Sequence, residues 1–383
     1  MENISRAIFH TLVHSMWQGL ILALLTGLIM VCTRKISASL RYHLLTGSLF
    51  LFAAIVVYTL VMELNIDELD SHQTVDPHLR HNFVSVIFSN IQQHVVIFVA
   101  AWFTLVLIKS FRLILGLYTL KRLKRVKINT MSSFWEERFK VLTETMKIAG
   151  PITLFESGIA QVPLLIGYLK PVILIPIGLV NSLEPEQVEA ILLHELAHIV
   201  RKDYLVNLIQ KIIESLLFFN PAVLWISYLI RSERENCCDD IVVSQTKNRV
   251  GYMRALISFE EYRQNLPDQV LAITGNTGAI PQRIERMISG KNRSLLKLEV
   301  IILSLMTILF ATVSIDNFKF SDIASRSRQQ QLSNHNPPLS PSLRENQHTC
   351  TTCPFMLNKQ ICPACNNNIQ AQCASMLSIP ATY

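Results

Sequence analysis

The sequence predicts a mainly α-helical membrane protein, with four transmembrane helices and a mixed α+β domain inserted before the last of them. Half of the 383 residues are apolar, only 16% are charged, and the mean hydropathy is +0.33. Long uncharged runs alternate with charged segments, and the segment before the last run contains both strand-like and helix-like patterns. This composition excludes a disordered chain and a collagen-like one.

Four apolar runs are candidate transmembrane helices, at about residues 8–32, 44–62, 95–120 and 298–315. The first can cross roughly 30 Å of hydrocarbon. It is too long for the apolar core of a signal peptide, and no small-residue cleavage site follows it. The third continues beyond its apolar part as an amphipathic helix, and the fourth is short but uncharged.

The charges that flank these runs predict a multi-pass orientation in the cytoplasmic (inner) membrane. The loop at 63–93 is acidic, whereas the other flanking segments are basic. Because positive residues mark the cytoplasmic side, we expect the N-terminus and the tail at 316–383 outside and the domain at 121–297 inside. The net charge of +7 then reflects cytoplasmic loops, so the lipid bilayer is an expected partner and direct nucleic-acid contact is not expected. The basic residues are Arg34, Lys35, Arg41, Lys109, Arg112, Lys121, Arg122, Lys124, Arg125, Lys127, Arg283, Arg286, Lys291, Arg293 and Lys297.

Polar residues also occur inside the first predicted span. His10, His14 and Gln18 fall on one helical face. Such residues are functional candidates, and the plainer alternative is a polar seam packed against another helix.

The inside domain begins with a strand-like pair, Val162–Tyr168 and Val172–Pro176. The flanking prolines favour a hairpin at the edge of a sheet. A helix is expected over about 186–200, with Ser182 as its cap and Pro185 in its first turn.

That helix contains the sequence His194-Glu195-Leu196-Ala197-His198. Residues four apart lie on one face of a helix, so His194 and His198 can share a Zn²⁺ ion. Glu195 is rotated by about 100° from His194 and lies beside the metal, where it can accept a proton from water.

A catalytic zinc needs a third protein ligand, and Glu235 is the candidate. Asp239 lies four residues later on the same helical face and suits a partner for a ligand histidine. Glu233 competes but lacks such an aspartate. Cys237 and Cys238 are adjacent and diverge on a helix, so buried structural roles are expected for both.

Several segments together resemble the membrane zinc peptidases of the β-lactam-sensor and methicillin-resistance antirepressor family, over about residues 1–315. The resemblance implies a gluzincin-like fold for the inserted domain and one Zn²⁺ per chain, held by His194, His198 and Glu235, with Glu195 as general base and acid. It also implies regulated proteolysis on the cytoplasmic side, either of a transcriptional repressor or of the protein's own loop. Asp203 matches a family position, and its role as a partner of a ligand or of a neighbouring arginine stays open. The matching segments are His14–Gly19, Lys170–Pro176, His194–His198, Arg201–Asn207, Phe218–Val223 and Arg234–Asp239.

The helical stretch 204–230 is long enough for a fifth span, but Lys211, Glu214 and Pro221 argue against one.

The strand at Val172–Ile175 bears on how a substrate would bind. If it is an edge strand, it would hold the substrate backbone by strand addition.

The tail departs from the family pattern. Its β-lactam-sensing members end in a penicillin-binding domain with a Ser-x-x-Lys motif, which this tail lacks, so sensing by acylation is not expected. A linker rich in Ser, Gln, Asn and Pro leads to a Cys-rich segment at 350–373. Disulfides are favoured outside the cell, with metal capture and a redox-active pair as alternatives. Four of these cysteines form two Cys-x-x-Cys spacings: Cys350, Cys353, Cys362 and Cys365.

Three functions are compatible with these features. The leading one is an integral-membrane zinc endopeptidase in signal transduction to transcription, acting on a cytoplasmic protein. The others are a quality-control zinc protease and a non-catalytic signalling receptor on the same scaffold. A homodimer is left open, as is the metal used in the cell.

Overall fold

The protein is described by a computed structural model. It covers residues 2–66, 94–124, 126–167, 170–264, 279–308 and 311–312. Residues up to Ile308 form one unit by their internal contacts, and of the second unit, Leu309–Tyr383, only residues 311–312 are described. The acidic loop from residue 67 onward and the predicted disulfide or metal residues Cys350, Cys353, Cys362 and Cys365 lie outside the described residues.

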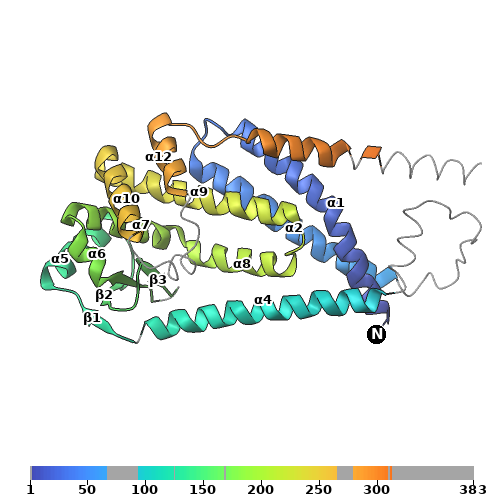
Figure 1. The fold of residues 1–383 in the computed structure, drawn as a ribbon, viewed down its shortest axis with the longest axis horizontal. Coiled ribbons are helices and arrows are strands. Elements are labelled where there is room, and N and C mark those ends of the chain that lie inside the picture. The colour runs from blue at the N-terminus through green and yellow to red at the C-terminus, as the bar shows by residue number, and fades with distance from the viewer. Residues whose placement is uncertain are drawn as a thin grey trace, which may run out of the picture. The chain divides into compact units, whose positions relative to one another are not determined.

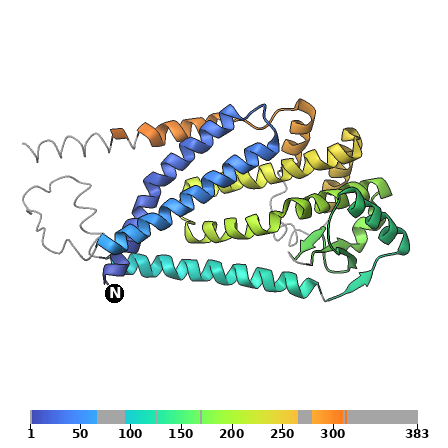
Figure 2. The same cartoon turned by 180° about the vertical axis from the view of Figure 1, so that it is seen from behind.

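Among the described residues, three helices are long and apolar enough to cross a membrane, and they coincide with the first three predicted spans. α1 packs along α2, and α2 packs along α9 (Figure 1). α8 lies between α4 and α9 in both views (Figures 1 and 2). The bounds are α1 Glu2–Cys32, α2 Ala38–Ile66, α4 Val95–Leu123, α8 Asp203–Leu216 and α9 Pro221–Thr246.

The fourth predicted span is described only in its first part. Residues 297–308 are helical, and this part is too short to be counted among the candidate spans of the described residues. A count of four spans therefore stays a prediction. The stretch 204–230 is not one continuous helix, because α8 ends at Leu216 and α9 begins at Pro221.

The inserted domain is built on a four-stranded sheet in the order β1-β2-β4-β3. β3 and β4 form the predicted antiparallel pair, with Leu164 opposite Leu174. β4 is not an edge, however, because β2 pairs with its other side in parallel. Its prolines end the strand rather than interrupt it, and the continuous apolar run from Val172 to Ile175 is fully buried, as is typical of a central strand. The strands are β1 Ile128–Thr130, β2 Thr153–Ser157, β3 Leu164–Ile166 and β4 Val172–Pro176.

One hydrophobic core joins this sheet to the surrounding helices. Leu192 and Leu196 of α7, Ile173 of β4 and Val242 of α9 are all fully buried within it. α7 is capped by Glu184, whose side chain and that of Gln187 form a capping box. Ser182 is the expected cap but ends the preceding α6 instead, so the cap lies two residues later than expected, while the helix begins at Pro185, close to the expected start at about 186. The remaining bounds are α5 Ser133–Thr145, α6 Ile177–Ser182, α7 Pro185–Arg201, α10 Arg249–Gln264 and α12 Ala279–Ser289.

The polar residues of α1 form a seam against α2. Gln18 donates a hydrogen bond to Thr59 at 2.9 Å. His14 and His10 lie 3.5 Å and 3.8 Å from the carboxylate of Glu63. The seam interpretation of these residues therefore fits the packing of the two helices.

Candidate metal centre

The helix α7 places two imidazole rings on one face. His194 and His198 are four residues apart, and their ring centroids are 5.0 Å apart. The neighbours of the two rings on α7 (Leu192, Leu193, Leu196 and Ala197) are buried in the core. Burial of this apolar face fixes the rotation of the helix, so the position of each ring is set by packing.

The helix α9 supplies a carboxylate to the same place. Glu235 Oε2 lies 3.3 Å from His194 Nε2, and Glu235 Oε1 lies 3.8 Å from His198 Nε2. One ligand atom from each of the three residues lies within 4.8 Å of the other two. The structure thus brings together the three side chains expected to hold a metal ion.

The outer nitrogen of each ring has an acidic partner. His194 Nδ1 lies 3.5 Å from Asp239 Oδ1, and His198 Nδ1 lies 2.9 Å from Asp203 Oδ2. An N–H that points at a carboxylate leaves the lone pair of Nε2 directed toward the cluster. Both predicted partner residues therefore lie where they can select the tautomer that binds metal.

The chain reversal between α7 and α8 explains the position of Asp203. Lys202 adopts a left-handed conformation with φ of 58°, which ends α7 and begins α8. Asp203 is thereby turned back toward His198 and also accepts a hydrogen bond from Arg201 Nε at 3.3 Å. The two roles left open for this residue, partner of a ligand and partner of an arginine, occur together.

Two residues of the cluster were not found by sequence reasoning. Tyr252 of α10 lies with its hydroxyl 3.0 Å from His194 Nδ1 and donates to Asp239 Oδ1 at 2.7 Å. Arg283 of α12 donates from Nε to Asp239 Oδ2 at 2.9 Å and has Nη1 3.4 Å from Glu235 Oε2. No short motif marks either residue. From the sequence, Arg283 is only one of the basic residues that precede the fourth predicted span.

The pKa values of the two glutamates of the cluster shift in opposite directions. Burial would raise the pKa of Glu235, but the hydrogen bond with His194 and the positive charges of His198 and Arg283 hold it well below its usual range. Burial raises the pKa of Glu195 despite the two histidines. Glu235 is therefore ionised, as a ligand must be, while Glu195 is tuned toward proton transfer.

The donor set fits zinc. Two imidazole nitrogens and one carboxylate oxygen are the protein ligands of one class of catalytic zinc site. A second group, made by His198, Asp203 and Cys238, also lies within metal-binding distance. It shares His198, whose Nδ1 atom lies 3.3 Å from Cys238 Sγ, and burial raises the pKa of the Cys238 thiol.

The competing carboxylate Glu233 belongs to a different environment. Its Oε1 atom lies 3.0 Å from Arg41 Nε of α2, and both side chains are buried. Glu233 also accepts a hydrogen bond from Asn236 at 3.1 Å. It therefore joins α9 to α2 and does not face the two histidines.

Membrane-type helices and a cluster of two histidines and one carboxylate that could hold a metal are the features expected of a membrane metallopeptidase. The family model described as BlaR1 peptidase M56 matches residues 3–288. The chain belongs to this family, and the resemblance stated from the sequence is confirmed.

Curated relatives carry regulatory names. The chain is 27% identical over 128 residues to the regulatory protein BlaR1 of Bacillus licheniformis, covering 33% of this chain and 21% of that protein. It is 27% identical over 142 residues to the methicillin resistance mecR1 protein of Staphylococcus aureus strain Mu50, covering 36% and 24%. A match to the regulatory protein BlaR1 of Staphylococcus aureus covers 45% and 28% at the same identity. The chain thus spans less than a third of the length of the relatives it matches.

Proposed function

We propose that this protein is a zinc-dependent endopeptidase of the cell membrane that hydrolyses peptide bonds on the cytoplasmic side. The observation that carries the proposal is the convergence of His194, His198 and Glu235, with Glu195 next to the first ligand on the same helix. Membership of a peptidase family supports it. The basic flanks of the predicted spans support the cytoplasmic location of the cluster.

Three side chains would hold the ion: His194 and His198 through Nε2, and Glu235 through its carboxylate. When bound, zinc polarises the scissile carbonyl and acidifies a water molecule. Asp239 and Tyr252 orient His194, while Asp203 orients His198. Arg283 keeps Glu235 ionised and holds Asp239 in place.

Glu195 acts as the general base and then as the general acid. It takes a proton from the attacking water and delivers it to the leaving amine. Burial raises the pKa of Glu195, which makes it a stronger base than an exposed carboxylate and a usable acid in the second step.

The proposed biological role is regulated proteolysis in signal transduction to transcription. The names of the relatives, regulatory protein and methicillin resistance protein, support it. The substrate would be a cytoplasmic repressor or the protein's own loop. The extracytoplasmic tail with Cys350, Cys353, Cys362 and Cys365 would be placed to receive a signal.

The test compares wild type with Glu195→Gln in membranes, with bound zinc and self-cleavage measured on the same samples. We expect zinc in both proteins and cleavage only in wild type, because the substitution removes the base and spares the ligands. Added candidate repressors extend the assay if the chain does not cut itself. Absence of zinc from wild type would contradict the proposal and favour a non-catalytic receptor.

A further inference from the structure

A pocket of about 510 Å³ opens beside the metal cluster, and His198 forms part of its wall. The apolar part of the wall comes from the loop after α5, from β3 and from the end of α7. It includes Ile148, Pro151, Leu165 and Ile199. A side chain placed here would lie next to a bond held at the cluster.

The charged side chains of this wall are lysines. Lys147 and Lys202 line the pocket and no acidic residue does. Both are exposed, and neither has an ion-pair partner within the residues that the structure describes. Lys124 and Lys170 lie close by, with Lys124 Nζ donating to the carbonyl of Lys170 at 3.2 Å. The pocket therefore offers positive charge that the fold itself does not neutralise.

The backbone at both lysines is unusual. Lys147 and Lys202 have φ of 52° and 58°, a left-handed region that L-residues with a side chain rarely adopt. Each ends a helix, so the geometry follows from the chain reversal. As a consequence, both lysines are held at the rim by rigid helix ends rather than by mobile loops.

The open edge of the sheet borders the same pocket. In the described part of the chain β3 pairs only with β4, and Leu165 and Gly167 line the pocket. An extended peptide that adds to β3 would run past the two lysines and His198. Strand addition at this edge replaces the expected use of Val172–Ile175, which is a central strand.

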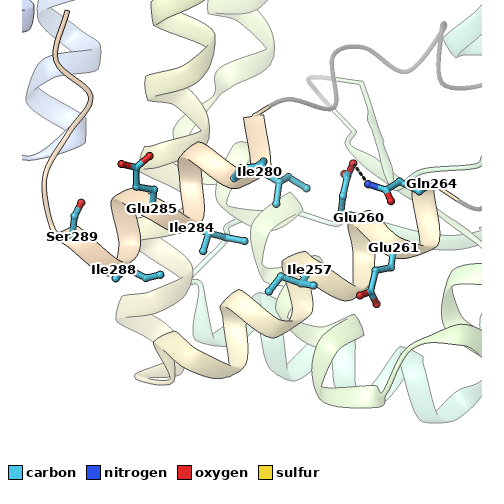
Figure 3. Close-up of a pocket in the computed structure, with 10 residues that line it drawn as sticks. Ile257, Glu260, Glu261, Gln264, Ile280, Ile284, Glu285, Ile288 and Ser289 are labelled. Atoms are coloured by element: carbon cyan, nitrogen blue, oxygen red, sulfur yellow. Dashed lines mark hydrogen bonds between the residues drawn. The ribbon is translucent and has the colours of Figure 1, made fainter. Parts of the chain in front are cut away.

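The other large pocket has the opposite charge. It measures about 590 Å³, lies between α10 and α12, and has Glu260, Glu261 and Glu285 among its apolar side chains (Figure 3). The basic pocket is thus not a general property of this surface. Of these two pockets, the basic one has a metal-cluster residue in its wall.

We infer that the pocket beside His198 selects an acidic and apolar peptide segment, with Lys147 and Lys202 pairing with a carboxylate near the scissile bond. The inference rests on the proposed function and names its substrate class. A lipid surface would also attract lysines, but the concave wall and its inclusion of His198 favour a peptide.

The test uses matched fluorescent peptides that differ only in an acidic, a neutral or a basic residue on either side of one apolar core. Cleavage is measured with wild-type protein in phosphatidylcholine vesicles, and binding is measured with Glu195→Gln. The variants are Lys147→Glu and Lys202→Glu. The matched control is Lys247→Glu, because Lys247 also ends a helix with φ of 52° but does not line the pocket.

We expect wild type to prefer the acidic peptide to the basic one by about tenfold, since two close ion pairs contribute roughly 1 kcal/mol each at most. Each pocket variant should lower this preference by about fivefold, and the control should keep it. Binding with this preference but no cleavage would overturn the proposed function alone. Cleavage without charge preference would overturn the substrate inference alone, and the lysines would then be tested for effects in anionic vesicles. Absence of both binding and cleavage would overturn both.

Discussion

Glu233 and Glu235 are two residues apart on α9 and belong to two different regions of the molecule. Glu235 faces the two histidines of α7, with His194 Nε2 at 3.3 Å. Glu233 is buried against Arg41 of α2 at 3.0 Å. Two residues correspond to about 200° of helical rotation, so the two carboxylates leave α9 on opposite sides.

The comparison shows that the role of a glutamate on α9, as a structural anchor or as a candidate metal ligand, depends on the side chains that it contacts. The side chain of Glu233 is 2% exposed and that of Glu235 is 31% exposed, and a charge that loses water is costly unless it is compensated. Glu235 is compensated by His194, His198 and Arg283. Glu233 is compensated by one buried arginine and Asn236. One helix therefore carries a proposed catalytic ligand on one face and a structural anchor to the helical bundle on the other.

The largest effect is expected at the metal cluster. Glu235→Gln should lower zinc affinity more than about 100-fold, because loss of a residue that merely supports a ligand already costs roughly 10–100-fold. Cleavage should fall to background while the thermal unfolding midpoint of the metal-free protein changes little. The measurement is zinc content after dialysis against a metal buffer. Retention of zinc by this variant together with loss of zinc in Glu233→Gln would reverse the assignment.

Arg41→Leu tests the structural face of α9. It leaves Glu233 buried without its cation, and we expect a loss of about 3–5 kcal/mol in the free energy of unfolding. The zinc content of the protein that remains folded should stay the same. Unfolding in detergent measures the first effect and metal analysis the second.

The control for Arg41→Leu is the double variant with Glu233→Leu. It removes both charges, so much of the lost stability should return. A double variant as unstable as the single one would show that Arg41 acts mainly through other contacts, such as its hydrogen bond to the carbonyl of Arg293 at 2.6 Å.

Tyr252→Phe should have a smaller effect on the metal. It removes the hydroxyl that lies 3.0 Å from His194 Nδ1 and donates to Asp239, and we expect zinc affinity to fall about tenfold. Competition with a zinc chelator gives the affinity. Tyr262→Phe on the same helix α10 is the matched control, and an equal loss in both variants would contradict a specific role for Tyr252.

The parts of the molecule predicted from sequence are those with a local signal. Three apolar runs and the four-residue spacing of His194 and His198 each depend on residues close together in the chain. Glu235 was identified because Asp239 repeats at the helical period. Asp203 lies five residues from His198, although only the left-handed turn at Lys202 shows why the two meet.

The parts that were missed depend on contacts between distant segments. The flanking prolines of β4 favour an edge strand, and the parallel pairing of β2 with β4, which has no turn signal, makes β4 a central strand instead. Tyr252 and Arg283 reach the cluster from helices that carry no zinc motif, and their positions follow only from the packing of α10 and α12 on α7 and α9. The capping position is also predicted wrongly, because Ser182 is a preferred capping residue whereas Glu184 is not, and only the structure shows that α6 extends to Ser182.

The smallest effect is expected at the start of α9, far along the helix from both glutamates. Asn220 caps α9 by accepting from the backbone of Ala222 and Val223 and donates to the carbonyl of Ser15 at 2.8 Å. Asn220→Ala should cost about 1 kcal/mol of stability and leave zinc affinity unchanged, because this end of the helix touches α1 and not the cluster.

Gly19 of α1 supplies the control for this contact. A Cβ atom at Gly19 would lie 2.5 Å from Asn220 Nδ2, so Gly19→Ala should destabilise the wild-type protein. The same substitution should be much less harmful when residue 220 is already alanine, because the clashing amide is gone. Equal costs of Gly19→Ala in the two backgrounds, measured by thermal unfolding, would mean that α1 and α9 are not held together by this close approach.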